Sequence, residues 1–271
     1  MKPYKYYDPK NNRLIYLVQK ADSTFWDQRW KTKDIRAEIT GKKYDFLVLP
    51  ATGKYLAPGS KILEGGCGHG TFVYSLNKAG YDCIGVDFAR ETIKRIKKAL
   101  PVLNVRYGDL RNLNFPDNHF DGYWSIGVIE HFWKGYGQIL KEMKRVVKPN
   151  GYLFLTFPYM SPLRNLKSKM GAYPPANFNH EPADFYQFAL DSKNVIKSVE
   201  NHGFKLTQKK PFDGFRGLQS EAKSLGFILK PIDNLAQKSI FGQALRFAIA
   251  RTVQSFASHS ILVVFRKNTS I

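Results

Sequence analysis

A short apolar strand that leads directly into alternating glycines is the feature that most constrains the fold of this chain. The strand covers residues 61–64, and the sequence Gly66-Cys67-Gly68-His69-Gly70 follows one residue later. Alternating glycines allow a backbone to approach a ligand closely. Because a helix-like stretch at 71–78 comes next, we expect a strand, a ligand-binding loop and a helix in succession.

The residues around these glycines exclude some classes of ligand and favour another. A dinucleotide-binding loop has the pattern G-x-G-x-x-G, which fails here because Thr71 or Val73 stands where the third glycine is needed. A P-loop is excluded because no Gly-Lys-Ser/Thr follows. The acid Glu64 comes two residues before the glycines. Its charge argues against a phosphate and favours a ligand with an amine or another positive group.

Strands and helices alternate through most of the chain. The expected strands are residues 61–64, 83–87, 105–109, 120–126, 152–157, 204–208 and 260–266, and the expected helices are 71–78, about 92–100, about 136–147 and 192–201. This alternation predicts an α/β fold, in which right-handed βαβ units form a parallel sheet with helices on both faces.

Two stretches depart from this regularity. Residues 159–183 are rich in proline and predict a loop-rich insertion, and a second insertion at 213–258 ends in a helix. Residues 1–57 are rich in aromatic side chains, with a helix expected to start at Asp22 or Ser23. We therefore expect an aromatic N-terminal segment, 1–57, and a main domain, 58–271, with insertions at about 159–190 and 213–258.

Composition excludes several classes of protein. The 271 residues are 43% hydrophobic, which is too apolar for a disordered polar chain, and no run approaches the ~18 apolar residues of a membrane span. The N-terminus lacks the apolar core of a secretory signal, and two cysteines make neither a disulfide framework nor a metal cage. We therefore expect a cytoplasmic protein. The net charge of +20 indicates nucleic acid, anionic lipid or an acidic substrate as partner, or simply a basic surface.

Four acids lie at or just beyond the ends of expected strands. Glu64, Asp87, Asp109 and Glu130 are separated by 23, 22 and 21 residues, about one βα unit each. Since ligands of such sheets bind at the carboxyl ends of the strands, we expect all four to face the same rim. The alternative for Glu130 is a helix cap.

These features together resemble a known family. The run 62–70, Asp87, the sequence Gly108-Asp109-Leu110, the pair Glu130-His131 and the turn 148–151 are similar to those of class I S-adenosylmethionine-dependent methyltransferases. Within that class the chain most resembles the small-molecule branch that includes the quinone-biosynthesis enzymes. The resemblance covers about 58–158, with a weaker tail to 210 and the final strand. It implies a Rossmann-like, seven-stranded, mostly parallel sheet whose last strand is antiparallel, with the N-terminal segment as a lid.

The resemblance also implies a cofactor, S-adenosyl-L-methionine, with S-adenosyl-L-homocysteine as product and no metal. Glu64 and the glycine loop would hold the methionine end, Asp87 the ribose hydroxyls and Asp109 the adenine amino group. The implied cofactor-binding residues are Glu64, Gly66, Cys67, Gly68, Gly70, Asp87, Phe88, Asp109, Leu110, Ile126 and Gly127.

The acceptor side is less clearly marked. His131 is the first candidate for a general base, and packing or capping of the next helix is its alternative role. His180, in the first insertion, is the second candidate. Tyr16, Trp26 and Trp30, with His131, are expected to line the acceptor pocket, although Trp26 and Trp30 could equally pack the N-terminal helix onto the core.

We therefore expect a methyltransferase (EC 2.1.1.-) that acts on an oxygen of a small molecule: a sugar, a phenol or quinone precursor, or a glycolipid intermediate. An RNA methyltransferase is one alternative. Nucleic acid is not favoured, because Ser125-Ile126-Gly127-Val128 replaces the Asn/Asp-Pro-Pro-Tyr type of motif expected after the fourth strand of base amino-methylases. A non-catalytic binding module with the same fold is the other alternative.

One further segment bears on partners. Residues 235–257 predict a basic amphipathic helix, which suits peripheral contact with an anionic membrane, core packing or a dimer face. A monomer and a homodimer both remain open.

Overall fold

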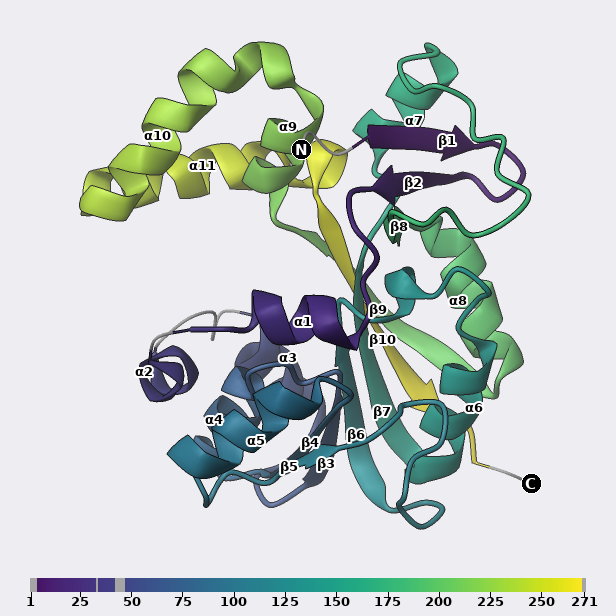
Figure 1. Cartoon of the computed structure of the whole chain (residues 1–271), viewed down its shortest axis with the longest axis vertical. Coiled ribbons are helices and arrows are strands. Elements are labelled where there is room, and N and C mark those ends of the chain that lie inside the picture. Colours follow the sequence, from purple (N-terminus) through teal and green to yellow (C-terminus); the bar gives the residue numbers. More distant parts are fainter. Residues whose placement is uncertain (1–3, 33, 42–46, 270–271) are drawn as a thin grey trace.

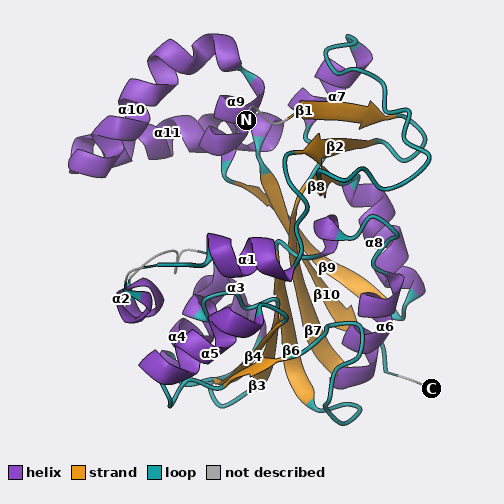
Figure 2. Ribbon diagram, in the orientation of Figure 1, coloured by secondary structure: helices purple, strands orange, loops and turns teal. Residues whose placement is uncertain are grey.

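A seven-stranded sheet forms the centre of the molecule in the computed structural model, which describes residues 4–32, 34–41 and 47–269 (Figures 1 and 2). The strand order is β5-β4-β3-β6-β7-β10-β9. The bounds are β3 (Lys61–Gly65), β4 (Asp82–Asp87), β5 (Val105–Tyr107), β6 (Phe120–Ile126), β7 (Val147–Pro158), β9 (Phe204–Phe212) and β10 (Ser260–Lys267). Strands β3 to β7 pair in parallel, and β10 runs antiparallel to both β7 and β9. The predicted Rossmann-like fold is confirmed.

Helices cover both faces of this sheet. One face packs against α2 (Ile35–Thr40), α3 (Val48–Tyr55), α4 (Thr71–Lys78) and α5 (Arg90–Ala99), and the other against α6 (Gly137–Val146) and α8 (Ser192–Asn201). Successive side chains of β6 point to opposite faces of the sheet, because side chains alternate along a strand. Tyr123 points into the α6 side, whereas Trp124 stacks on Phe154 at 4.5 Å and donates to Thr52 Oγ1. The buried indole thus has a stacking partner for its ring and a hydrogen-bond acceptor for its N–H.

A second, three-stranded sheet stands beside the first. It consists of β1 (Tyr4–Asp8), β2 (Arg13–Leu17) and β8 (Phe185–Ala189), so it joins the N-terminal segment to the first insertion. The aromatic N-terminus did not predict β1 and β2, and the prolines of the insertion concealed both β8 and α7 (Pro162–Lys169). Strand β2 finds its partner about 170 residues away, a pairing that local pattern does not encode.

A buried charge cluster fastens this small sheet to the rest of the chain. The carboxylate of Glu221, at the end of α9 (Gly214–Glu221), accepts from Lys5 Nζ at 2.7 Å, Arg164 Nε at 3.0 Å and Tyr173 OH at 2.7 Å. Burial opposes the charge of Glu221, but Arg164 and Lys5 prevail and lower its pKa to about 2. Lys167 also pairs with Glu221, so three cations share one carboxylate. Removal of Glu221 would leave buried charge uncompensated, so this residue fixes how these elements meet.

The carboxyl ends of the parallel strands share one edge of the large sheet, and this edge positions the site. Helix α1 (Ser23–Arg29) lies across it, with Asp22 as N-cap through a 2.9 Å bond from Phe25 N (Figure 1). Both β7 and β9 also end at this edge, because each is antiparallel to β10. The second insertion, with α9, the 3₁₀ turn η2 (Lys223–Leu225), α10 (Gly226–Lys238) and α11 (Ile240–Ala257), therefore emerges there. No helix among the described residues is long and apolar enough to cross a bilayer.

Candidate active site

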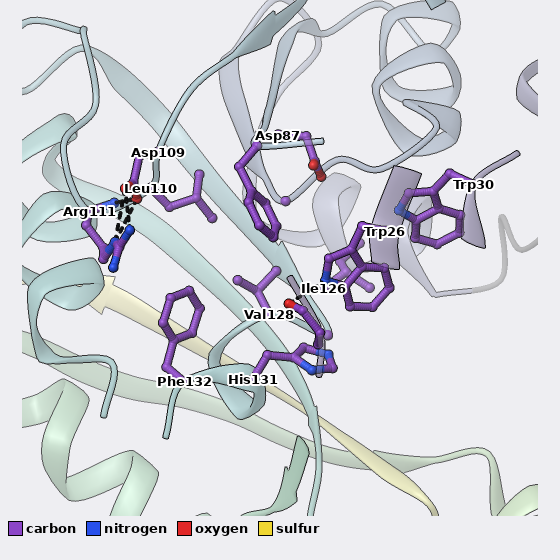
Figure 3. A pocket seen from close by; sticks show the side chains of 14 residues that line it. Trp26, Trp30, Asp87, Asp109, Leu110, Arg111, Ile126, Val128, His131 and Phe132 are labelled. Carbon is purple, nitrogen blue, oxygen red and sulfur yellow. Dashed lines mark hydrogen bonds and ion pairs between the residues drawn. The ribbon is translucent and has the colours of Figure 1, made fainter. Parts of the chain in front are cut away.

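A cavity of about 210 Å³ lies at the carboxyl edge of the sheet, beneath α1 (Figure 3). Its lining comes from four strand ends, from α1 and from the 3₁₀ turn η1 (Ile129–His131). The lining residues are Ala21, Trp26, Trp30, Gly66, Asp87, Phe88, Asp109, Leu110, Arg111, Ile126, Gly127, Val128, His131 and Phe132. Figure 3 shows Asp87 and Asp109 on one side of the space and His131 and Phe132 on the other.

The glycine loop is shaped by backbone that other residues rarely adopt. Gly66 has a φ of +80°, and a Cβ there would lie 2.5 Å from Val128 Cγ2. The loop and the segment after β6 therefore approach so closely that only glycine fits at position 66. Gly68 and Gly70 also have positive φ, but they and Cys67 do not line the cavity.

Asp87 connects the end of β4 to the glycine loop. Its Oδ2 accepts from the Gly68 amide and its Oδ1 from the Ala89 amide, both at 2.8 Å. Burial raises the pKa of Asp87, while these backbone donors act in the opposite direction. The carboxylate is thus held in one orientation at the cavity wall.

Asp109 is engaged by a residue that sequence reasoning missed. Arg111 grips it with two nitrogens: Nε lies 3.0 Å from each carboxylate oxygen, and Nη2 lies 2.7 Å from Oδ2. Bonds from Arg111 lower the pKa of Asp109. The pair is about half exposed, so it sits at the mouth of the cavity rather than in its depth. Sequence spacing does not predict an ion pair between residues two apart, because a bend of the backbone brings the two side chains together.

Glu64 lies behind the loop and does not line the cavity. Its side chain is buried, and Oε2 has no hydrogen-bond partner among the described residues. Burial and the nearby Asp87 carboxylate raise the pKa of Glu64 well above its ordinary value. Such an orphaned acid is costly unless a donor or a cation reaches it.

His131 lines the opposite side and is fixed by a carbonyl. Its Nδ1 lies 2.7 Å from the Tyr186 carbonyl oxygen, which only accepts, so Nδ1 carries the proton and donates. Burial lowers the pKa of His131 to about 4, so the ring is neutral near pH 7 and its Nε2 keeps a free lone pair. The rings of His131 and Trp26 pack in a T-shaped arrangement, with their centroids 5.1 Å apart.

Helix α1 forms the roof and is tied down by polar contacts. Trp26 and Trp30 stack on each other at 5.6 Å over the cavity. Between them Asp27 Oδ1 accepts from both the amide and the hydroxyl of Thr92, each at 2.8 Å, at the start of α5. The Trp30 carbonyl lies 2.7 Å from His69 Nε2. Sequence reasoning missed Asp27, whose partner is 65 residues away.

Two residues predicted for the acceptor side lie elsewhere. Tyr16, on β2, is buried in a cluster with Met160 and Tyr173, and His180 is exposed in the loop before β8. Neither lines the cavity. Tyr16 faces this cluster because β2 pairs with β8 in the small sheet.

Comparison with known proteins agrees with this geometry. Residues 63–155 match the methyltransferase domain family. A probable S-adenosylmethionine-dependent methyltransferase of Mycolicibacterium smegmatis is 26% identical over 148 residues, and a demethylmenaquinone methyltransferase of Staphylococcus saprophyticus is 40% identical over 101. These matches cover 55% and 35% of this chain. Over residues 63–155 the chain is thus similar to the methyltransferase domain family, and the two relatives are both named as methyltransferases.

The match to these relatives is partial, and the fold match is broader. The chain spans only 53% and 43% of the length of the two relatives. The crystal structure of an S-adenosylmethionine-dependent methyltransferase from Mesorhizobium loti superposes with a TM-score of 0.54 at 16% identity, over 80% of this chain and 96% of that one. The likeness to this solved structure, at 16% identity, is one of fold.

The cofactor that this similarity implies is S-adenosylmethionine, which the name of the Mycolicibacterium smegmatis relative contains. The residues present fit it: the orphaned carboxylate of Glu64 suits an ammonium group, and the backbone of Gly66 lines the cavity without a side chain. Within the described part of the chain, no three His, Cys, Asp or Glu side chains are grouped to hold a metal ion.

Proposed function

We propose that this chain transfers a methyl group from S-adenosylmethionine to an oxygen of a small-molecule acceptor in the cavity beneath α1. A phenol or quinone precursor, a sugar or a glycolipid intermediate would serve as acceptor. The observation that carries the proposal is the arrangement of the cavity, which sets oriented acids against a neutral histidine of fixed tautomer. The likeness to a protein named for demethylmenaquinone supports a phenol or quinone precursor as the class of acceptor, and the choice of oxygen rests on His131 alone.

On the cofactor side, the chain's residues bind and orient. Glu64, whose Oε2 has no hydrogen-bond partner among the described residues, would accept from the ammonium of the methionine end. Asp87, held by two amides, would accept from the ribose hydroxyls with its remaining lone pairs. Asp109 would face the adenine, with Arg111 keeping it charged. The bound cofactor supplies a methyl group that its sulfonium already activates.

On the acceptor side, His131 would remove the hydroxyl proton. The proton passes to Nε2 as the acceptor oxygen gains its methyl group, and the imidazole becomes an imidazolium. Because burial weakens this base, an acidic hydroxyl suits it best. A phenol, with a pKa of about 10, is closer to imidazole than an aliphatic alcohol is. Trp26 and Phe132 offer aromatic surface on which a ring would stack.

The test measures two properties of each purified variant: the melting temperature with and without adenosylmethionine, and the turnover. Asp87→Ala should abolish the rise in melting temperature that adenosylmethionine gives the wild type. His131→Ala should keep that rise and lower turnover by about 10²-fold or more, measured as adenosylhomocysteine formed with a panel of phenols, quinols and sugars.

His180→Ala is the matched control, because His180 is exposed and outside the cavity. It should behave as wild type. If His131→Ala is fully active, or if His180→Ala loses as much, the assignment of the base is wrong. If adenosylmethionine fails to stabilise the wild type, the proposed function itself fails.

A further inference from the structure

The hairpin formed by α10 and α11 exposes large apolar side chains. Ile240 is 84% exposed, Phe227 76%, Phe241 72% and Phe247 64%. Figure 1 shows the two helices reaching away from the large sheet. Single exposed apolar residues are normal, but several on one projecting element mark an interaction surface.

Contacts between α10 and α11 hold the hairpin together, so its exposed side chains have defined positions. Asp233 on α10 and Arg246 on α11 form an ion pair at 2.9 Å. The helices cross so closely that a Cβ on Gly242 would collide with the Leu235 backbone. Ser239 caps α11 through a 3.0 Å bond from the Gly242 amide, which fixes the turn at the tip.

Cations stand among the apolar side chains at helical spacing. Residues 226–257 contain four basic residues and one acidic residue, a net charge of +3. Since Asp233 is paired with Arg246, the exposed cations are Lys230, Lys238 and Arg251. On α11, Ile240, Phe247 and Arg251 lie seven and eleven residues apart and so share one face. At the tip, Lys238 adjoins the two apolar residues that follow Ser239.

We propose that the α10–α11 hairpin docks on an anionic lipid surface. Aromatic and aliphatic side chains that stand beside lysine and arginine suit the boundary between headgroups and acyl chains. Charge decides between possible occupants. A second copy of this chain would bring another +20 against the first, whereas an anionic membrane supplies the opposite sign.

The hairpin also lies in a useful place. It emerges between β9 and β10 at the carboxyl edge of the sheet, the edge that holds the cavity. A membrane bound there faces the same side of the molecule as the cavity. The docking goes beyond the proposed function and does not depend on it, because binding is measured without cofactor or acceptor.

The test compares co-sedimentation with vesicles of phosphatidylcholine plus phosphatidylglycerol and with vesicles of phosphatidylcholine alone. The wild type should bind the anionic vesicles at least about tenfold more tightly, and less tightly as salt rises. Phe241→Asp should reduce this binding about tenfold. Its matched control is Val102→Asp, since Val102 is 93% exposed but lies outside the hairpin; that variant should bind like wild type.

A second pair of variants tests the charge. Lys230→Glu with Lys238→Glu should reduce binding by about tenfold or more, because each basic residue near an anionic surface contributes about fivefold. Lys97→Glu with Lys98→Glu, on α5, changes the net charge equally and should have a much smaller effect. Melting temperatures of all variants verify folding.

Four outcomes would overturn the proposal. The wild type fails to prefer anionic vesicles, or a control variant loses as much binding as its hairpin counterpart. The wild type forms a dimer that Phe241→Asp dissociates, which would make the hairpin a self-association face. A single-stranded RNA oligomer binds with the same dependence on the hairpin lysines and Phe241, which would make it a nucleic-acid surface.

Discussion

The two walls of the cavity are built in different ways. The wall that we propose binds the cofactor, called the cofactor wall, contains Gly66, Asp87, Asp109 and Gly127 and follows the ends of four neighbouring strands. The wall that we propose faces the acceptor, called the acceptor wall, contains Trp26, Trp30, His131 and Phe132 and combines a helix from the N-terminus with the turn after β6. Backbone geometry and amide hydrogen bonds set the first wall, whereas side chains distant in sequence hold the second. One wall is therefore a property of the sheet, and the other depends on how separate elements dock.

The largest effect is expected from breaking the cofactor wall at its tightest point. Gly66→Ala adds a Cβ at a φ of +80° and drives it into Val128. Either the loop or the segment after β6 must shift, so we expect complete loss of the melting-temperature rise with adenosylmethionine.

Gly59→Ala separates this effect from backbone strain alone. Gly59 has a φ of +84°, but a Cβ there meets nothing within 4 Å. We expect it to cost about 1–2 kcal/mol of stability and to leave the cofactor-induced rise intact. Equal loss in both variants would show that strain, and not the close approach of the two segments, governs the cofactor wall.

The same contrast explains what the sequence could predict. The constant spacing of strand ends predicted that Glu64, Asp87, Asp109 and Glu130 face one rim. Asp87 and Asp109 line the cavity, whereas Glu64 and Glu130 do not. Local pattern carries that information, since it places each residue relative to its own strand.

Several residues that were missed or misplaced depend on contacts distant in sequence. Asp27 acts through Thr92, a partner that only the docking of α1 brings near. Tyr16 was expected at the pocket because it is aromatic and N-terminal, but β2 pairs with β8 and turns it into a separate cluster. His180 lies on a loop whose path no periodicity defines. Sequence patterns thus predict the fold and most of the cofactor wall, and tertiary pairing sets the rest.

A second prediction concerns how pH acts on the cofactor wall. The pKa of Glu64 is raised, so the free protein holds a proton there at pH values where an exposed glutamate is ionised. An ammonium beside Glu64 favours the carboxylate, so binding the cofactor should release that proton. Affinity should therefore rise with pH until it passes the raised pKa, and level off above it.

Glu64→Gln should remove this slope, because glutamine does not titrate. It should also weaken binding at high pH by roughly 10- to 100-fold, the worth of a hydrogen bond to a charged group. Calorimetric titration of adenosylmethionine in two buffers of different ionisation enthalpy measures both the affinity and the proton count. A wild-type affinity independent of pH would place the ammonium away from Glu64.

The smallest effect should come from loosening the acceptor wall. Asp27 accepts from the Thr92 amide and hydroxyl, so it caps α5, whose own N-cap residue Ala89 gives no side-chain bond. Asp27→Ala removes that cap and frees α1 from α5. A cap contributes about 1 kcal/mol, so we expect KM for the acceptor to rise about fivefold with kcat little changed. Asp22→Ala is the matched control, because Asp22 caps α1 itself and the cap does not involve α5. If α1 acts as a roof through its tie to α5, the Asp22 variant should raise KM by less than the Asp27 variant. Equal increases would mean that the integrity of α1, and not its attachment, shapes the acceptor wall.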